Sequence, residues 1–308
     1  MRVRFWLLGL MATVVFACGG NGSGNTDAGG GDGDGGGDGD GGSTVDGSFP
    51  GTCTPGGSTQ CSDCIDNDSD GKIDGFDPEC TGPLDNREDS FATGIPGDNI
   101  DATDQDCFFD GNSGSGNDGC SQHVCCLVQA KGAPQQTPTE QLAADKAECA
   151  RLVPNSLSNK YNPAECYVPF GNAPVPAKCT MNCGPLTPPG CDCFGCCTIC
   201  DVNNNCRDII LNPAVSPNCN QDNIADNGQD GVDNTGDEPC KRCVKNTMCG
   251  SDECGGDTCI LCPGQDPNDL PSSCTGTTCP GDIMPCDANG ACPVNLYCSN
   301  GCCVGTIF

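Results

Sequence analysis

The sequence predicts small disulfide-rich modules, made mostly of loops and short β-strands with one helix at about 138–153, behind a disordered Gly/Asp-rich N-terminal tether. The chain of 308 residues holds 33 cysteines. Leu, Ile, Val and Phe make up only about 14% of residues 18–308, below the roughly 20% under which acidic chains are usually disordered. Hydrophobic burial alone therefore cannot fold this chain. Up to sixteen disulfides, at about 2–4 kcal/mol each, must supply much of the order.

The N-terminus has the features of an export signal. A short basic region, MRVR, precedes an apolar run at 5–16 and then Ala17 and Cys18. A twelve-residue apolar run is too short to span a bilayer and fits a signal-peptide core. The residues VFAC at 15–18 resemble a bacterial lipobox, although Phe16 stands where a small residue is usual. This resemblance implies lipid attachment to Cys18. The alternative is ordinary secretion with a free cysteine.

Cysteine parity agrees with lipidation. Assigning Cys18 to lipid leaves 32 cysteines, an even number that can pair completely. Export also favours disulfides, because they persist in oxidising compartments. Gly19 carries no acidic retention signal, which by resemblance to other lipoproteins favours the outer membrane. We therefore expect an outer membrane lipoprotein, at the cell surface or on the periplasmic face. Its expected partners are the membrane, through the lipid anchor, and a protein or glycan.

The charge and the tether limit the partners further. Cleavage would remove Arg2 and Arg4, so the formal charge moves from −29 to −31, and nucleic acid becomes a poor partner. Residues 19–51 include GGGDGDGGGDGDGG, a composition that gives a flexible, charge-extended tether. The predicted organisation is a signal peptide (1–17), the lipid anchor and tether (18–51), a calcium-loop module (52–92), a central cysteine-rich region with one helix (93–218), and a C-terminal cysteine-rich module with a second acidic loop (219–308).

The strongest motif is the acidic stretch from Cys61 to Cys80, CSDCIDNDSDGKIDGFDPEC. Counted from Asp66, carboxylates fall at positions 1, 3, 5, 9 and 12, with glycine at 6, which is the EF-hand loop register. A calcium ion takes six to eight oxygen ligands, so alternate side chains, one carbonyl and a returning carboxylate would surround it. The predicted metal ligands are Asp66, Asp68, Asp70, the carbonyl of Lys72, Asp74 and Asp77.

This loop resembles the calcium loops of dockerins and thrombospondin type 3 repeats over about a dozen residues. Asp77 departs from the EF-hand pattern, where a longer glutamate stands at position 12. Gly71 would allow the sharp turn of the loop, and Ile73 would point away from the ion into the core. The alternative is a turn cluster with no ion, since Asp, Asn and Gly favour turns by themselves.

A weaker copy of the loop lies between Cys219 and Cys240, CNQDNIADNGQDGVDNTGDEPC. Counted from Asp226, carboxylates fall at positions 5 and 12, the latter being Asp237, but glycine replaces the ligand at position 3. A plain turn is therefore favoured here over a cation loop. Two cysteine-flanked acidic loops nevertheless suggest a repeated structural motif.

A third acidic region has no recognisable ligand spacing. We interpret these residues as solvated turn residues, with a further cation site as the alternative. They are Asp98, Asp101, Asp104 and Asp106.

The predicted helix lies between Thr137 and Val153. Its first residues, TPTE, form a capping box with proline at the first helical position, and Pro154 ends it. Cys149 would hold its apolar face to the body, with Cys166 as a candidate partner.

Eight cysteines are clustered between Cys179 and Cys206, in CTMNCGPLTPPGCDCFGCCTICDVNNNC. Two CxxC pairs in this cluster, 193–196 and 197–200, are typical of zinc or iron–sulfur sites in cytosolic chains. Because export places them in an oxidising compartment, we expect disulfides instead, with adjacent cysteines bonding in opposite directions. Metal binding and redox catalysis are the alternatives. Thirteen further cysteines lie between Cys240 and Cys303, and their connectivity cannot be deduced from spacing.

No pattern in the sequence predicts an enzyme. His123 is the single histidine and has no nucleophile motif near it, so we interpret it as a surface residue. The Gly-rich runs are acidic and would repel phosphate. A (β/α)₈ barrel, as in the tryptophan synthase alpha chain, needs about 250 residues with long apolar strands. This chain lacks such strands, so the sequence does not support that enzyme.

The chain as a whole resembles cysteine-rich lipoproteins of Gram-negative predatory and soil bacteria. The resemblance rests on the lipobox, the tether, DNDSDG, FFDGNSGSGNDGC and CDCFGCC. We therefore expect a surface-tethered, calcium-binding lipoprotein that acts in binding, adhesion or envelope structure. The alternatives are a secreted hydrolase or redox protein, and a thiolate metal-binding protein.

Overall fold

The computed structural model describes residues 57–95, 103–111, 119–128, 143, 147, 174–224, 239–250, 253–287 and 289–306. All of them belong to one compact unit that starts at Thr44. The signal peptide, Cys18, the tether and the loop at 226–237 lie outside the described residues. So does most of the predicted helix, although Ala143 and Ala147 are helical. Among the described residues, no helix has the length and hydropathy needed to cross a membrane.

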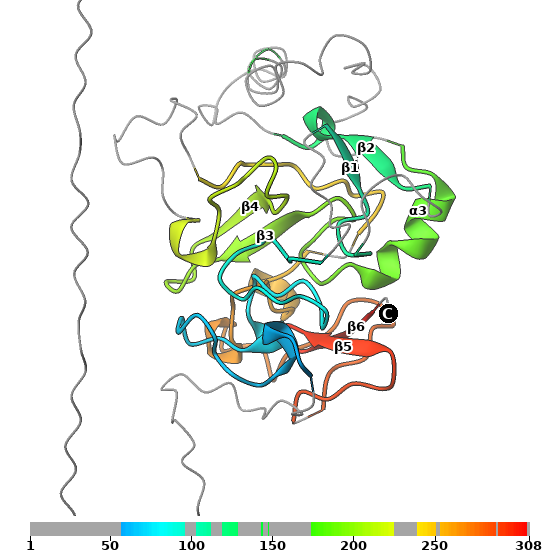
Figure 1. The fold of residues 1–308 in the computed structure, drawn as a ribbon. Coiled ribbons are helices and arrows are strands. Elements are labelled where there is room, and N and C mark those ends of the chain that lie inside the picture. The colour runs from blue at the N-terminus through cyan, green and yellow to red at the C-terminus, as the bar shows by residue number, and fades with distance from the viewer. Residues whose placement is uncertain are drawn as a thin grey trace, which may run out of the picture. The chain divides into compact units, whose positions relative to one another are not determined.

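In the described residues the strands form three two-stranded antiparallel sheets, and these short sheets confirm the predicted fold class (Figure 1). The strands are β1 (Asp104–Asp106) paired with β2 (Ser121–His123), β3 (Cys196–Cys200) with β4 (Cys206–Ile210), and β5 (Leu296–Ser299) with β6 (Cys302–Gly305). Two residues, Asn300 and Gly301, connect β5 to β6, both with positive φ. This is the Asn-Gly pairing that tight hairpin turns favour.

One prediction about this region was wrong. Asp104 and Asp106 lie in strand β1, and Asp106 is buried, so neither is a solvated turn residue. Asp98 and Asp101 lie outside the described residues.

The helices are short. They are η1 (Gln60–Ser62), η2 (Asp74–Phe76), η3 (Val124–Cys126), α3 (Ala177–Asn182), η4 (Gly184–Leu186), η5 (Gln221–Asn223), η6 (Gly256–Thr258) and η7 (Pro267–Asp269), where η marks a 3₁₀ turn. Helix α3 was not predicted from the sequence. It has no apolar stripe, and only Cys179 of its residues is buried. Cys179 and the next buried residue, Cys183, are four apart and so share one helix face.

Thirteen disulfides join described cysteines. They are 61–80, 107–183, 120–179, 191–197, 193–249, 196–243, 200–206, 219–240, 254–262, 259–274, 279–302, 286–298 and 292–303. Cys64, Cys125 and Cys126 are disulfide-bonded as well. The adjacent Cys196 and Cys197 bond to different partners, which confirms the prediction for the cluster.

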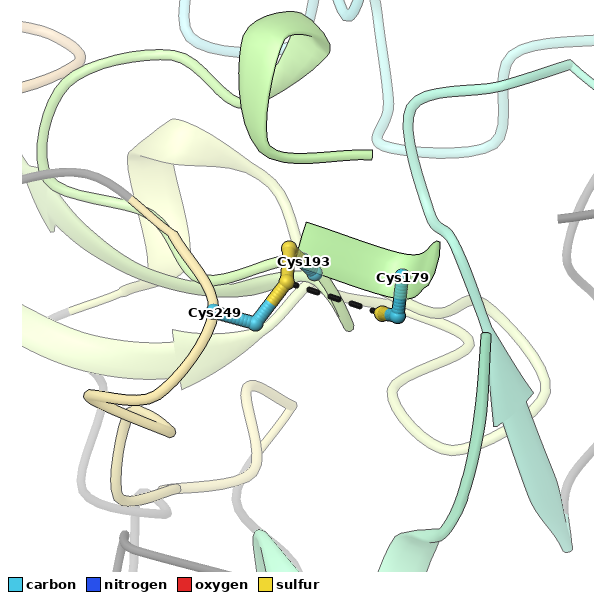
Figure 2. Close-up of side chains that lie close together, drawn as sticks. All are labelled: Cys179, Cys193 and Cys249. Atoms are coloured by element: carbon cyan, nitrogen blue, oxygen red, sulfur yellow. Dashed lines mark hydrogen bonds between the residues drawn. A yellow bond between two sulfur atoms is a disulfide. The ribbon is translucent and has the colours of Figure 1, made fainter. Parts of the chain in front are cut away.

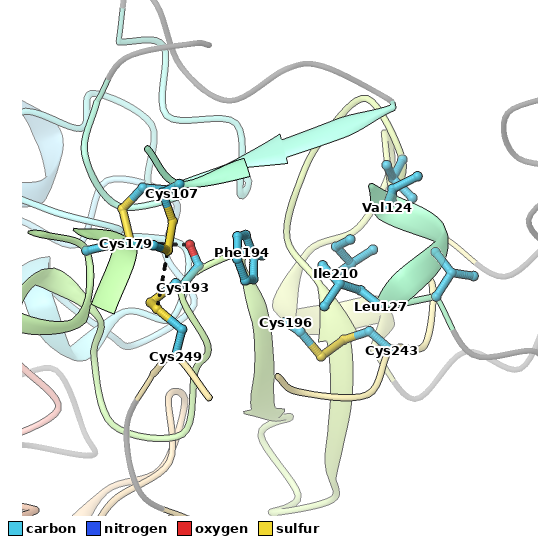
Figure 3. Packing of buried hydrophobic residues seen from close by; sticks show 14 of the residues in the cluster. Cys107, Val124, Leu127, Cys179, Cys193, Phe194, Cys196, Ile210, Cys243 and Cys249 are labelled. Carbon is cyan, nitrogen blue, oxygen red and sulfur yellow. Dashed lines mark hydrogen bonds between the residues drawn. A yellow bond between two sulfur atoms is a disulfide. The ribbon is translucent and has the colours of Figure 1, made fainter. Parts of the chain in front are cut away.

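Half-cystines also make up much of the core. The larger buried cluster has fifteen fully buried residues, nine of which are cysteines. Figure 3 shows Phe194 beside Ile210, with Leu127, Val124 and the Cys196–Cys243 disulfide around them. Sulfur therefore fills space that aliphatic side chains fill in ordinary domains.

The first module packs against the C-terminal hairpin (Figure 1). The Tyr297 hydroxyl donates to the Cys61 carbonyl at 3.0 Å, and the Asn300 N–H donates to the Gly75 carbonyl at 2.8 Å. A Cβ at Gly75 would overlap the Cys298 carbonyl oxygen, so glycine is required by this close approach. The predicted module boundaries stay predictions.

Asp192 organises the centre of the cysteine cluster. It is fully buried. Its Oδ1 accepts from the N–H groups of Phe194 and Cys196, both at 2.9 Å, and its Oδ2 accepts from Asn246 N–H at 2.7 Å. One carboxylate therefore fixes the turn between Cys191 and Cys197 and ties it to a distant segment.

We predict that Asp192→Ala lowers the free energy of unfolding by roughly 3 kcal/mol, because three N–H donors lose a buried acceptor. Urea unfolding of the oxidised protein measures this. Asp287→Ala is the matched control. Asp287 also accepts two N–H groups but is exposed, so water can replace it. Equal losses in the two variants would contradict the assignment.

Candidate cation site

Three of the predicted ligands lie together. One carboxylate oxygen from each of Asp66, Asp68 and Asp70 lies within 4.8 Å of the others. Each carboxylate also accepts an N–H of the same loop, from Ser69 (2.6 Å), Asp70 (3.1 Å) and Lys72 (2.8 Å) respectively. These contacts curl the loop so that its acidic side chains converge. We call this set the outer group.

The backbone of the loop is bent as its sequence predicts. Gly71 has φ of 95°, a conformation that L side chains rarely adopt. A Cβ at Gly71 would meet no atom within 4 Å, so conformation and not space requires the glycine. Ile73 is half-buried.

A carboxylate outside the loop holds it in place. Glu88 is fully buried. Its Oε2 accepts from Asn67 N–H at 2.7 Å and its Oε1 from Asp74 N–H at 2.8 Å. The Cys61–Cys80 disulfide closes the same stretch. Glu88 could not be predicted from sequence spacing, since it acts through backbone contacts made only in the folded chain.

Two of the remaining three predicted ligands, Lys72 and Asp74, are placed differently. The Asp74 carboxylate accepts from Cys64 N–H at 3.3 Å, and Asp74 belongs to neither carboxylate group described here. Lys72 donates its N–H to Asp70. A ligand role for Asp74 and for the Lys72 carbonyl stays a prediction.

A second carboxylate group is buried and shares one residue with the first. Oxygens of Asp70, Asp77 and Glu79 lie within 4.8 Å of one another, and Asp77 and Glu79 are 1% and 2% exposed. Glu79 was missed by the sequence analysis, because it lies beyond the twelve-residue register. We call this set the inner group.

The inner group presents two oxygens that have no hydrogen-bond partner. Asp77 Oδ1 accepts from Glu79 N–H at 2.7 Å, and Glu79 Oε1 accepts from Gln221 N–H at 2.6 Å. Among the described residues, Asp77 Oδ2 and Glu79 Oε2 have no partner. Buried polar atoms without partners are rare and costly. Each carboxylate is therefore fixed through one oxygen, and its other oxygen is left for a cation or for a proton shared between the two carboxyl groups.

Burial and the neighbouring carboxylates disfavour ionisation of the carboxyl groups at this site. Burial, and then the neighbouring carboxylates, raise the pKa of Asp77 well above its usual range, and burial raises that of Glu79. Two carboxylates at 4.8 Å repel by about 3 kcal/mol at an effective dielectric of about 20. Burial also raises the pKa of Asp68 and Asp74 to about 6 and that of Glu88 to about 7. A bound cation would remove this penalty.

Close cysteine sulfurs elsewhere form no thiolate site. Cys179, Cys193 and Cys249 have sulfurs within 4.8 Å of one another, and the Sγ atoms of Cys179 and Cys249 are 3.6 Å apart (Figure 2). Each belongs to a disulfide, so these contacts are packing between covalent bridges.

His123 has a structural contact. It is half-buried, and its Nδ1 accepts from Cys125 N–H at 3.1 Å, which caps η3.

Comparisons with known proteins give no relative. No protein-family model matches the chain, and neither the curated proteins nor the solved structures contain a match.

We predict that the cation-free protein becomes less stable as the pH rises from 5 to 8. The folded-state pKa values of Asp68, Asp74 and Glu88 are raised, so over this range the folded chain binds more protons than the unfolded chain, and stability falls with pH. Thermal unfolding in chelator measures this, and Glu88→Gln should flatten the slope. A melting temperature that rises with pH in chelator would overturn the prediction.

Proposed function

We propose that the acidic loop binds calcium through Asp66, Asp68, Asp70 and Asp77. The observation that carries the proposal is the convergence of these carboxylates on two adjoining positions, with a buried Asp77 oxygen that has no hydrogen-bond partner in the described part of the chain. Aspartate oxygens are ligands that hard cations prefer, and the irregular loop suits calcium, whose coordination is flexible. Magnesium demands a more regular octahedron.

The disulfides support export. All 29 described cysteines are disulfide-bonded, a state that persists in oxidising compartments. The proposed protein is an outer membrane lipoprotein anchored through Cys18, with residues 19–51 lifting the folded body away from the lipid. The disulfide state also weakens the thiolate-metal and redox alternatives, since both require thiols.

The body of the protein is proposed to bind a partner, as an adhesin or envelope component would. A cavity of about 260 Å³ is lined in part by the segment that directly follows Cys80. The disulfide of Cys80 closes the acidic loop. Its lining includes Leu84, Ile95, Phe108, Phe109 and Tyr297. Apolar and aromatic walls of this kind are typical of binding sites. Because the acidic loop ends at Cys80 and the cavity wall begins at Thr81, calcium bound in the loop would stiffen one wall of the cavity.

Calcium binding is tested by titration calorimetry of the oxidised protein. We expect Asp70→Asn to weaken calcium binding by about tenfold or more, because Asp70 belongs to both carboxylate groups. Asp89→Asn is the matched control, since Asp89 is exposed and ion-paired with Arg87 in the same module. Absence of calcium binding by the natural chain at millimolar concentration would rule the proposal out.

Lipid attachment is tested with Cys18→Ser. We expect this variant to lose fatty-acid labelling and to leave the membrane fraction, since no other anchor is proposed. Unchanged labelling would show that the lipid is attached elsewhere or that the lipobox resemblance misleads.

Partner binding is tested by retention of envelope components on the immobilised protein. We expect retention in calcium and its loss in chelator or with Phe109→Ala. The control is Val294→Ala, an exposed apolar residue that does not line the cavity. Equal retention by the Phe109 variant would place the partner outside the cavity, and no retention under any condition would count against a binding role.

A further inference from the structure

The inner group contacts a segment that lies far away in the sequence. The Gln221 N–H donates to Glu79 Oε1 at 2.6 Å, although the residues are 142 positions apart. Gln221 opens the turn η5, which begins at the second acidic segment, between Cys219 and Cys240. This segment was predicted as a weaker copy of the first loop. Its first turn reaches the carboxylate of Glu79, whereas the loop at 226–237 lies outside the described residues.

Gln221 is held rigidly enough to orient Glu79. The side chains and backbone of Asn220 and Asn223 form a capping box around η5. The Gln221 side chain donates from Nε2 to the Cys200 carbonyl at 3.0 Å, and the Cys219–Cys240 disulfide closes the segment. The capping box and the disulfide therefore fix the backbone N–H of Gln221 without its side chain, and this N–H fixes one oxygen of Glu79.

Glu79 presents an oxygen at a spacing that calcium ligands have. Oxygens on opposite sides of one calcium ion lie about 4.6–5.2 Å apart, because each Ca–O bond is about 2.3–2.6 Å. The oxygens of Asp70, Asp77 and Glu79 lie within 4.8 Å of one another. Among the described residues, Asp77 Oδ2 and Glu79 Oε2 have no hydrogen-bond partner, and both side chains are almost completely buried.

We infer that Glu79 is a calcium ligand of the inner group and that Gln221 positions it. The second acidic segment therefore completes the cation site of the first loop, and calcium joins two parts of the chain that the sequence separates. This inference rests on the proposed calcium binding. The competing arrangement is a proton shared by the two buried carboxyl groups with no ion, which leaves calcium affinity independent of Glu79.

The test compares three variants of the full oxidised chain by calorimetric titration with calcium chloride. Glu79→Gln removes the charge of the ligand. Gln221→Pro and Gln221→Ala both remove the side chain, and only the proline also removes the N–H. Proline is tolerated at the first position of a helical turn, and Asn220 already has the extended backbone that precedes proline (φ −150°, ψ 172°).

We expect calcium binding to weaken about tenfold or more in Glu79→Gln and Gln221→Pro, and to change less than about threefold in Gln221→Ala. Hydrogen exchange supplies a second readout that does not depend on the proline variant. Calcium should slow exchange of the Gln221 amide in the natural chain and not in Glu79→Gln, because the ion fixes the acceptor of that amide.

Failure of the Glu79 inference and failure of the proposed calcium site give different results. If Glu79→Gln binds calcium as tightly as the natural chain while Asp70→Asn does not, the inference is wrong and the proposed calcium site stands. If Gln221→Ala weakens binding as much as Gln221→Pro, the N–H is not the positioning group. If the natural chain binds no calcium, both the inference and the proposed site fall.

Discussion

The shortage of large apolar side chains is the constraint on which this structure depends. Because hydrophobic burial is limited, covalent cross-links hold the chain, and nine of the fifteen residues in the larger buried cluster are cysteines. Buried carboxylates do a related task. Asp192 and Glu88 accept hydrogen bonds from backbone N–H groups. In ordinary domains such N–H groups are paired within longer helices and sheets. Regular structure is correspondingly short, with three two-stranded sheets among the described residues.

The acidic site also depends on disulfides. Disulfides close the stretch that carries the inner group, Cys61–Cys80, and the segment that supplies the Gln221 N–H, Cys219–Cys240. Cross-links of this kind can hold carboxylates at a spacing that their repulsion opposes. Asp77 and Glu79 are buried with raised pKa values, so the cation-free site carries a penalty. A divalent ion at this position would convert the penalty into a calcium-dependent gain in stability.

The sequence predicted the parts of this site that depend on local spacing. Asp66, Asp68 and Asp70 alternate along one loop, so their convergence follows from the register and from the turn at Gly71. Glu79 and Gln221 could not be predicted, because their contact joins segments 142 residues apart. The fold class followed from composition, whereas the disulfide pairs did not follow from spacing. The α3 helix was missed because its buried face is made of cysteines and not of an apolar stripe.

The most direct test of the account is a crystal structure of the oxidised chain grown in calcium. We expect an ion bound by Asp70, Asp77 and Glu79, with the Gln221 N–H still donating to the other oxygen of Glu79. A structure at saturating calcium in which the Asp77 and Glu79 carboxyl groups are hydrogen-bonded to each other, with no ion between them, would contradict it. In that case the acidic loops would be turns whose buried charges are neutralised by protons.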